Sequence, residues 1–290
     1  MESKQKNILV TGGSGFIGSH IVDKLIDLQY KVRVLDIKEP HRNDIDFIQG
    51  SIVSKRDIEK SVKGIDAVFH FGGFSNIDLV KSHPLETVQL NIWGTTLLLE
   101  ECYKKKVKRF ILASSVYVNE DKGHLYTASK RSAELVCASY NKLYKLPYTI
   151  LQLATAYGPR SRNKDVISIF VECILNGKNI VIHGDGKQKR NFIFVEDLAN
   201  GCVASLKQKG ENKTFILAGK ETISIKQLAK TIIKLTKNDI EINYNPSKSR
   251  EDDYCGYVLN QDKFQKEIGW SPKVDIIEGI KKYIDWYNTT

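Results

Sequence analysis

The chain has 290 residues, of which 41% are apolar and 27% charged, the balance of a globular protein with one large domain or two small ones. Its five cysteines lie 29 to 53 residues apart with no C-x-x-C pair, which argues against zinc and a disulfide framework and favours reduced thiols in the cytoplasm. The net charge of +10 comes from scattered basic residues, an arrangement that does not support nucleic-acid binding but would attract an anionic, phosphorylated substrate.

The first predicted elements are a strand at 7–10, a glycine-rich turn and a helix that begins near Phe16. The spacing of Gly13, Gly15 and Gly18 fits G-x-G-x-x-G, and Gly12, Gly15 and Gly18 also fit G-x-x-G-x-x-G. Glycines allow a tight turn and a close approach of the backbone to a pyrophosphate, whose charge then lies at the helix N-terminus. No signal peptide and no apolar run of about 18 residues appear, so we expect a soluble protein without a membrane partner.

An acidic residue supports a dinucleotide site. The second strand, 31–36, ends in Asp36, 18 residues after Gly18, where a carboxylate can bind an adenosine ribose. Asp36 favours NAD over NADPH because it repels a 2′-phosphate, although Arg33 and Lys38 nearby weaken that inference.

Alternating strands and helices continue to about residue 155, which predicts a Rossmann-type, doubly wound parallel sheet. The further strands are expected at 45–49, 66–70, 109–113 and 148–153, and the helices at 54–62, 84–105 and 126–144. After Gly158-Pro159-Arg160 the elements shorten, with helices expected at about 165–176, 195–207, 224–237 and 274–287. We therefore predict an NAD-binding domain at 1–157, which also receives about 191–218, and a smaller α/β domain at 158–290 that mainly binds substrate.

A Tyr-x-x-x-Lys pattern at Tyr126 and Lys130 supplies candidate catalytic groups. Residues four apart on a helix share a face, so the phenol and the ammonium can address one site. Lowering a phenol pKa from about 10 to about 7 takes roughly 4 kcal/mol, which a nearby cation and a cationic nicotinamide can supply. Ser115, or Ser114 in its place, follows a strand of the sheet and completes a proton-handling trio.

An ordered series of motifs resembles the extended short-chain dehydrogenases/reductases, specifically the NAD-dependent nucleotide-sugar epimerase/dehydratase family typified by UDP-galactose 4-epimerase. The similarity runs nearly end to end and rests on Thr11–His20, Asp36, His70–Gly73, Asn91–Thr95, Ala113–Ser115, Tyr126-x-x-x-Lys130, Tyr157–Arg160, His183–Gly186, Arg190–Asp197 and Ile268–Pro272.

The resemblance implies a role for each matched residue. Tyr126 would be the acid/base, Lys130 would hold the nicotinamide ribose, and Ser115 would bind the reacting hydroxyl. The implied NAD contacts are Gly12, Gly15, Phe16, Ile17, Gly18, Asp36, Ser51, Ile52, Phe71, Gly72, Gly73, Asn91, Ser114, Tyr126 and Lys130. The implied contacts with a nucleotide-diphosphate sugar are Ser75, Ser115, Thr155, Arg190 and Arg250. The family also implies a homodimer formed through the helices at about 84–105 and 126–144.

Several positions depart from the family pattern. Ser51 replaces the usual acidic residue after the third strand. Gln152 stands where relatives usually have an arginine, and Thr155 stands where many have an asparagine that contacts the nucleotide. Tyr126 follows Ser115 by only eleven residues, whereas relatives commonly have a longer loop, and Tyr117 is not followed by the usual glycine. The identity of the sugar is therefore the property least transferable from the family.

The residues after Ser115 bear on the reaction. Sugar 4,6-dehydratases of the family carry an Asp-Glu pair there, and this chain has Val116-Tyr117. We therefore expect an epimerase that transiently oxidises the sugar at C4. A C4 dehydrogenase and an NAD(P)H-dependent 4-ketosugar reductase remain alternatives, while a 4,6-dehydratase is disfavoured. A non-catalytic dinucleotide-sensing module is also disfavoured because such a protein would be expected to lose Tyr126 or Lys130.

Overall fold

The computed structural model describes residues 6–75, 77–119, 124–161, 165–246 and 260–289. The chain forms two compact units. The first comprises Met1–Leu153, Ala199–Ile216 and Asp262–Trp270, and the second comprises Ala154–Leu198, Leu217–Gln261 and Ser271–Thr290.

A seven-stranded sheet is the centre of the first unit. Its order is β10-β6-β5-β4-β1-β2-β3, and the pairings among β1 to β6 are parallel. The strands are β1 (Asn7–Thr11), β2 (Lys31–Asp36), β3 (Asp46–Gln49), β4 (Ala67–His70), β5 (Arg109–Ser115), β6 (Tyr148–Leu153) and β10 (Lys213–Leu217). The predicted Rossmann-type fold class is confirmed.

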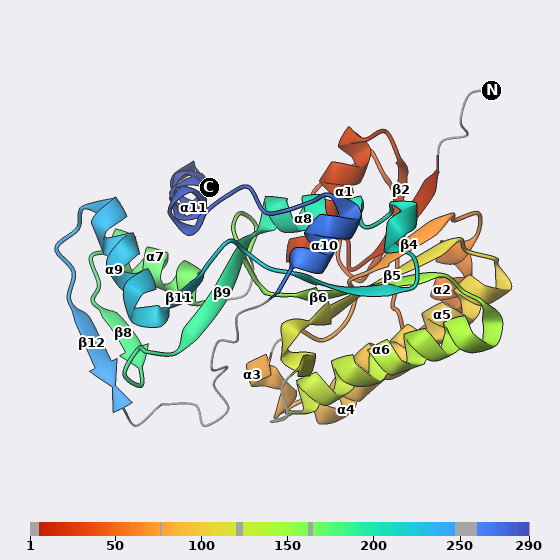
Figure 1. The fold of residues 1–290 in the computed structure, drawn as a ribbon, viewed down its shortest axis with the longest axis horizontal. Coiled ribbons are helices and arrows are strands. Elements are labelled where there is room, and N and C mark those ends of the chain that lie inside the picture. Colours follow the sequence, from red (N-terminus) through yellow and green to blue (C-terminus); the bar gives the residue numbers. More distant parts are fainter. Residues whose placement is uncertain (1–5, 76, 120–123, 162–164, 247–259, 290) are drawn as a thin grey trace. The chain divides into compact units, whose positions relative to one another are not determined.

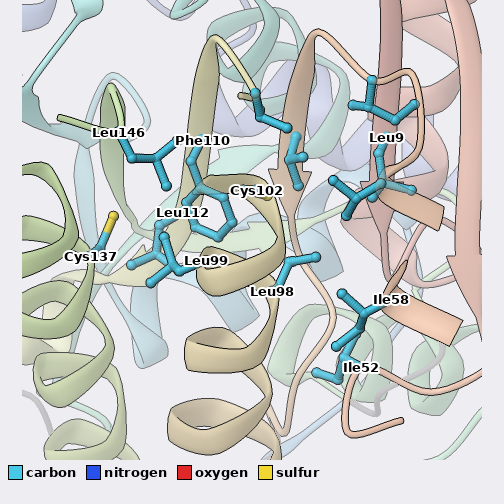
Figure 2. Packing of buried hydrophobic residues seen from close by; sticks show 14 of the residues in the cluster. Leu9, Ile52, Ile58, Leu98, Leu99, Cys102, Phe110, Leu112, Cys137 and Leu146 are labelled. Atoms are coloured by element: carbon cyan, nitrogen blue, oxygen red, sulfur yellow. The ribbon is translucent and has the colours of Figure 1, made fainter. Parts of the chain in front are cut away.

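Helices cover both faces of this sheet, as Figure 1 shows, with α2, α5 and α6 on one face and α1 and α10 on the other. The helices of this unit are α1 (Phe16–Asp27), α2 (Lys55–Val62), α3 (Ile77–Val80), α4 (Pro84–Val88), α5 (Thr95–Lys104), α6 (Leu125–Tyr144) and α10 (Asp262–Ile268). Helix α8 (Val195–Ala204) has residues in both units. A core that includes Leu9, Leu98, Phe110 and Leu112 is buried between the strands and α2, α5 and α6 (Figure 2). Burial of such side chains contributes about 1.5–3 kcal/mol each.

Two expected elements of the first unit differ from the structure by more than one residue. The single helix expected at 84–105 is interrupted by a π-helical segment, Gln89–Gly94, between α4 and α5. This segment contains Asn91, which is buried and bonded through its side chain to Phe74 and Ser129. Strand β5 extends two residues beyond the expected end because Ser114 and Ser115 pair with Gln152 and Leu153 of β6.

The second unit has two small sheets. In one, β9 (Lys189–Phe194) pairs in parallel with β7 (Thr155–Tyr157) and antiparallel with β11 (Thr222–Ser224). In the other, β8 (Ile180–His183) and β12 (Ile242–Asn245) are parallel. Aromatic and aliphatic side chains of these strands form a core with α7 (Val166–Leu175), α9 (Ile225–Thr236) and α11 (Ile276–Thr289). In the part of the chain described, no helix is both long and apolar enough to span a membrane.

Candidate active site

The predicted cofactor and catalytic residues all belong to the first unit. Strands β1, β2, β3, β4 and β5 are parallel, so the segments that follow them lie at one edge of the sheet. This carboxyl edge is where open α/β sheets bind ligands.

The glycine turn between β1 and α1 is closely packed. Gly12 has φ +71°, and a Cβ there would lie 2.6 Å from the Gly72 nitrogen. A Cβ on Gly18 would lie 2.1 Å from the Gly12 carbonyl oxygen. Gly15 is the N-cap of α1 and provides no side-chain cap, while Phe16 and Ile17 form the half-buried first turn. The N-terminus of α1 therefore keeps N–H groups available for a diphosphate.

Asp36 lies beside this turn at the end of β2. Its two carboxylate oxygens accept hydrogen bonds of 3.0 Å from the backbone N–H groups of Ser14 and Lys38. Arg33 is bonded to Asp46 and to the carbonyls of Ser61 and Lys63, so its guanidinium is engaged elsewhere. Arg33 is therefore not placed to bind the 2′-phosphate of NADPH, and the arrangement around Asp36 suits NAD.

The segments after β3 and β4 form the next part of the edge. Ile52 is buried, and a Cβ on Gly72 would lie 3.2 Å from its Cγ2. Gly73 has φ +155°, and a Cβ there would lie 2.7 Å from the Asn91 side-chain oxygen. The structure therefore brings together four predicted cofactor residues from three separate segments. Of the remaining predicted residues, Ser51 donates its N–H to Asp57 at 3.0 Å, Phe71 is half-buried and Ser75 is exposed.

A buried histidine at the end of β4, His70, links this edge to α5. His70 Nδ1 lies 2.7 Å from the Thr11 hydroxyl, and Nε2 lies 2.9 Å from the Thr95 hydroxyl. Because Thr95 donates to the Asn91 carbonyl and Thr11 accepts from the Gly72 N–H, the bonding pattern fits the neutral Nε2–H tautomer. Burial, helped by Lys130, lowers the pKa of His70 to about 3. A polar residue ending an otherwise apolar strand was the only local signal of this role.

The predicted trio lies at the ends of β5 and α6. Ser115 is the last residue of β5, and Tyr126 is near the start of α6, where the Ser115 hydroxyl approaches the Tyr126 phenol. Lys130 Nζ donates to the Ala113 carbonyl at 3.1 Å and lies 6.0 Å from the centroid of the Tyr126 ring. His124 caps the helix by accepting the Thr127 N–H at 3.2 Å. Serine, tyrosine and lysine are thus assembled on two adjacent elements.

Burial sets the acid–base properties of the trio in the chain without cofactor. Burial raises the pKa of Tyr126 to about 12, although the nearby Ser115 hydroxyl opposes this rise. Burial also lowers the pKa of Lys130 to about 8. Without cofactor the phenol is therefore neutral, and its use as a base requires further positive charge beside it.

Ser114 supplies another polar group at this edge. Its side chain is buried, and its hydroxyl approaches Glu134 without a hydrogen bond of ordinary geometry among the described residues. The hydroxyl therefore retains hydrogen-bonding capacity. The glycine turn has no room for a Cβ at Gly12 or Gly18. This turn, Asp36 and the Ser114 hydroxyl together make a set of groups that fits a dinucleotide.

The predicted substrate residues are divided between the two units. Ser75 and Ser115 lie in the first, whereas Thr155 begins β7 and Arg190 lies in β9 of the second. Arg190 donates to the Lys189 carbonyl at 3.2 Å. Arg250 lies outside the described residues, and the substrate contacts of all five residues remain predictions. No cluster of three or more His, Cys, Asp or Glu side chains suited to a metal occurs in the described ranges.

Comparison with known proteins is consistent with this geometry. Residues 8–218 match the NAD dependent epimerase/dehydratase family. The crystal structure of a UDP-glucose 4-epimerase with UDP-glucose from Thermotoga maritima is 32% identical, with a TM-score of 0.91 over 98% of this chain and 99% of that one. A mouse dTDP-D-glucose 4,6-dehydratase is 30% identical over 97% of this chain and 88% of its own length.

A trifunctional UDP-glucose 4,6-dehydratase/3,5-epimerase/reductase of Arabidopsis thaliana is also 30% identical, but this chain spans only 47% of that relative. Relatives of similar identity thus have different activities. What they share is the NAD-dependent chemistry of nucleotide sugars. The chain is therefore an enzyme of the NAD-dependent nucleotide-sugar epimerase/dehydratase family, which belongs to the extended short-chain dehydrogenases/reductases.

Proposed function

We propose that the protein is a nucleotide-sugar 4-epimerase that acts by transient oxidation at C4 of the sugar. The observation that carries this proposal is the Ser115–Tyr126–Lys130 trio at the carboxyl edge of the sheet. Ser115 is followed in the chain by Val116 and Tyr117 instead of acidic residues. NAD, when bound, accepts a hydride from C4 and returns it.

The trio would handle the proton that accompanies this hydride. Ser115 would orient the C4 hydroxyl, and Tyr126 would remove its proton as the C4–H bond breaks and the C4 carbonyl forms. The 4-keto sugar would then rotate in the site and present its opposite face. Hydride return to its opposite face, with proton return from Tyr126, would give the epimer. Lys130 would stabilise the phenolate and hold the nicotinamide ribose. Because the hydride removed from C4 is returned to C4, no external oxidant would be consumed.

A dehydratase would need further acid–base groups to remove a C5 proton and expel the C6 hydroxyl. At the matched positions Val116 is buried and Tyr117 is half-buried, and neither side chain is a carboxylic acid. The dehydratase relatives therefore do not argue for dehydration in this chain.

The reaction can be tested with UDP-glucose, UDP-galactose, UDP-N-acetylglucosamine and UDP-glucuronic acid, followed by proton NMR without added cofactor. We expect one pair of C4 epimers to interconvert, and denaturation of the protein to release nearly stoichiometric NAD⁺ or NADH. A 4-keto-6-deoxy product would indicate a dehydratase instead. Consumption of added NAD(P)H with no retained dinucleotide would indicate a reductase.

We also propose that the second unit binds the nucleotide-diphosphate part of the substrate through Thr155, Arg190 and Arg250. A guanidinium fork suits phosphate oxygens, and the net charge of +10 favours an anionic substrate. A cytoplasmic location is proposed because Cys102, Cys137, Cys173 and Cys202 are free thiols; Cys255 lies outside the described residues.

A homodimer formed by α4, α5 and α6 completes the proposal. Leu85 and Trp93, from α4 and the π-helical segment, are 85% and 55% exposed. Leu135 and Leu143 of α6 are 65% and 69% exposed. Large apolar side chains on neighbouring helices are suited to cover one another in a second copy of the chain.

The double substitution Leu135→Glu with Leu143→Glu should convert the proposed dimer to a monomer, because it would bury two unpaired carboxylates at the interface. Light scattering after size-exclusion chromatography should give twice 32.9 kDa for the unaltered chain and 32.9 kDa for the variant. Leu28→Glu is the control, since Leu28 is 50% exposed but lies at the end of α1. An unaltered chain that is already monomeric would contradict the dimer.

A further inference from the structure

A carboxyl group lies one helical turn beyond Lys130 on α6. Glu134 is half-buried, and Gln152 of β6 donates its amide to the two Glu134 oxygens at 3.1 and 3.3 Å. Asn119 in turn donates to the Gln152 side-chain oxygen at 2.9 Å. The Gln152 amide therefore holds this carboxyl group in place, and the Asn119 amide holds Gln152.

The groups that hold Glu134 are neutral. Amide donors orient a carboxylate without cancelling its charge, unlike a guanidinium, which would pair with it. Lys130 and Glu134 are four residues apart on the same helix and are both half-buried, so water screens their attraction only partly. Burial raises the pKa of the Glu134 carboxyl group, and the charges of Arg131 and Lys130 oppose this rise, so the Glu134 carboxylate and the Lys130 ammonium each favour the charged form of the other.

We propose that Glu134 is the counter-ion of Lys130, a positioning residue that keeps the lysine charged in its half-buried place and is itself held there by Gln152 and Asn119. Lys130 needs this support because its Nζ donates to the Ala113 carbonyl at the sheet edge, away from bulk water. The interaction between Glu134 and Lys130 does not depend on the proposed function. Only the statement that catalysis uses the lysine charge rests on it.

The surrounding titratable groups do not offer an alternative counter-ion. Burial lowers the pKa of the His70 imidazole, which is therefore neutral. Burial also raises the pKa of the Cys137 thiol and of the Tyr126 and Tyr148 phenols, so these groups are not anions. Arg131 is exposed and positive. Glu134 is the only carboxyl among these described neighbours. It raises the pKa of Lys130, while burial lowers that pKa to about 8.

The test is the titration of Lys130 in the full chain. Lysines are reductively ¹³C-methylated and followed by NMR against pH, and the Lys130 signal is identified by its loss in Lys130→Arg. In Glu134→Gln we expect the pKa of Lys130 to fall by about one unit, because the carboxylate that favours the ammonium is gone. In Gln152→Arg the pKa should also fall, because the new cation pairs with Glu134 and repels Lys130.

Glu59→Gln is the matched control. Lys55 and Glu59 have the same four-residue spacing, with 3.8 Å between charged atoms, but both are exposed on α2. We expect no change at Lys130 there. An unchanged Lys130 titration in both Glu134→Gln and Gln152→Arg would overturn the proposal. Gln152→Arg retains Glu134, so it provides the test even if Glu134→Gln does not fold.

Catalysis supplies a second, separable readout. If the lysine charge supports turnover, the fall of kcat at high pH should begin at a lower pH in Glu134→Gln than in the unaltered chain. KM should change little. Because the lysine titration is measured without turnover, it can succeed even if the epimerase assignment fails. A normal epimerisation activity with no movement of the Lys130 titration would instead leave the proposed function intact and remove the role of Glu134.

Discussion

Replacement of Tyr126 by Phe is expected to slow epimerisation by about 10³-fold while the protein stays folded and retains its dinucleotide. In the proposed mechanism the phenol is the group of the trio that exchanges a proton with the sugar, and the Ser115 hydroxyl approaches it. Phenylalanine preserves the ring that packs near Lys130 and removes only the hydroxyl. Turnover is measured by NMR with the nucleotide sugar identified from the panel, and dinucleotide content by release on denaturation.

Tyr140→Phe provides the control for this substitution. Tyr140 lies on the same helix, and its hydroxyl donates to Glu100 at 3.1 Å, away from the trio. Its loss should leave turnover nearly unchanged. Undiminished turnover in Tyr126→Phe would contradict the assignment of the acid/base, and with it the proposed mechanism.

Gly18→Ala is expected to abolish stable dinucleotide binding and to lower the free energy of unfolding by about 2–3 kcal/mol. The added Cβ would lie 2.1 Å from the Gly12 carbonyl oxygen, which is backbone and cannot move aside without opening the turn. Opening the turn would displace the N–H groups at the start of α1 from a bound diphosphate. The measurements are dinucleotide content after purification and a urea unfolding curve.

Gly64→Ala separates this steric effect from a general cost of replacing glycine. Gly64 has φ +75°, but a Cβ there would meet nothing within 4 Å. We expect about 1–2 kcal/mol of destabilisation from the left-handed backbone, with dinucleotide binding intact. Retention of NAD by Gly18→Ala would show that the glycine turn does not receive the diphosphate.

Features that depend on local patterns could be predicted from the residues alone. The turn from Gly12 to Gly18 needs glycine, and Asp36 ends an apolar strand at a set distance along the chain. The positions of the sheet strands follow from short apolar runs, and the shared face of Tyr126 and Lys130 follows from helical spacing. These patterns were sufficient for the fold class and the dinucleotide cofactor, whereas the family followed from the resemblance of the whole series of motifs.

The tertiary structure decided the features that depend on burial and on residues far apart in the chain. Gln152 was notable in the sequence only as a departure from the family, and its hydrogen bonds to Glu134 join positions 18 residues apart. His70 meets Thr11 across 59 residues, and its partners, not its spacing, favour one tautomer. Burial raises the pKa of Tyr126 in the chain without cofactor, an effect that the spacing to Lys130 does not predict. Helical spacing indicates which side chains share a face, but it carries no information on how much water the folded chain leaves around them, and that quantity controls their charge.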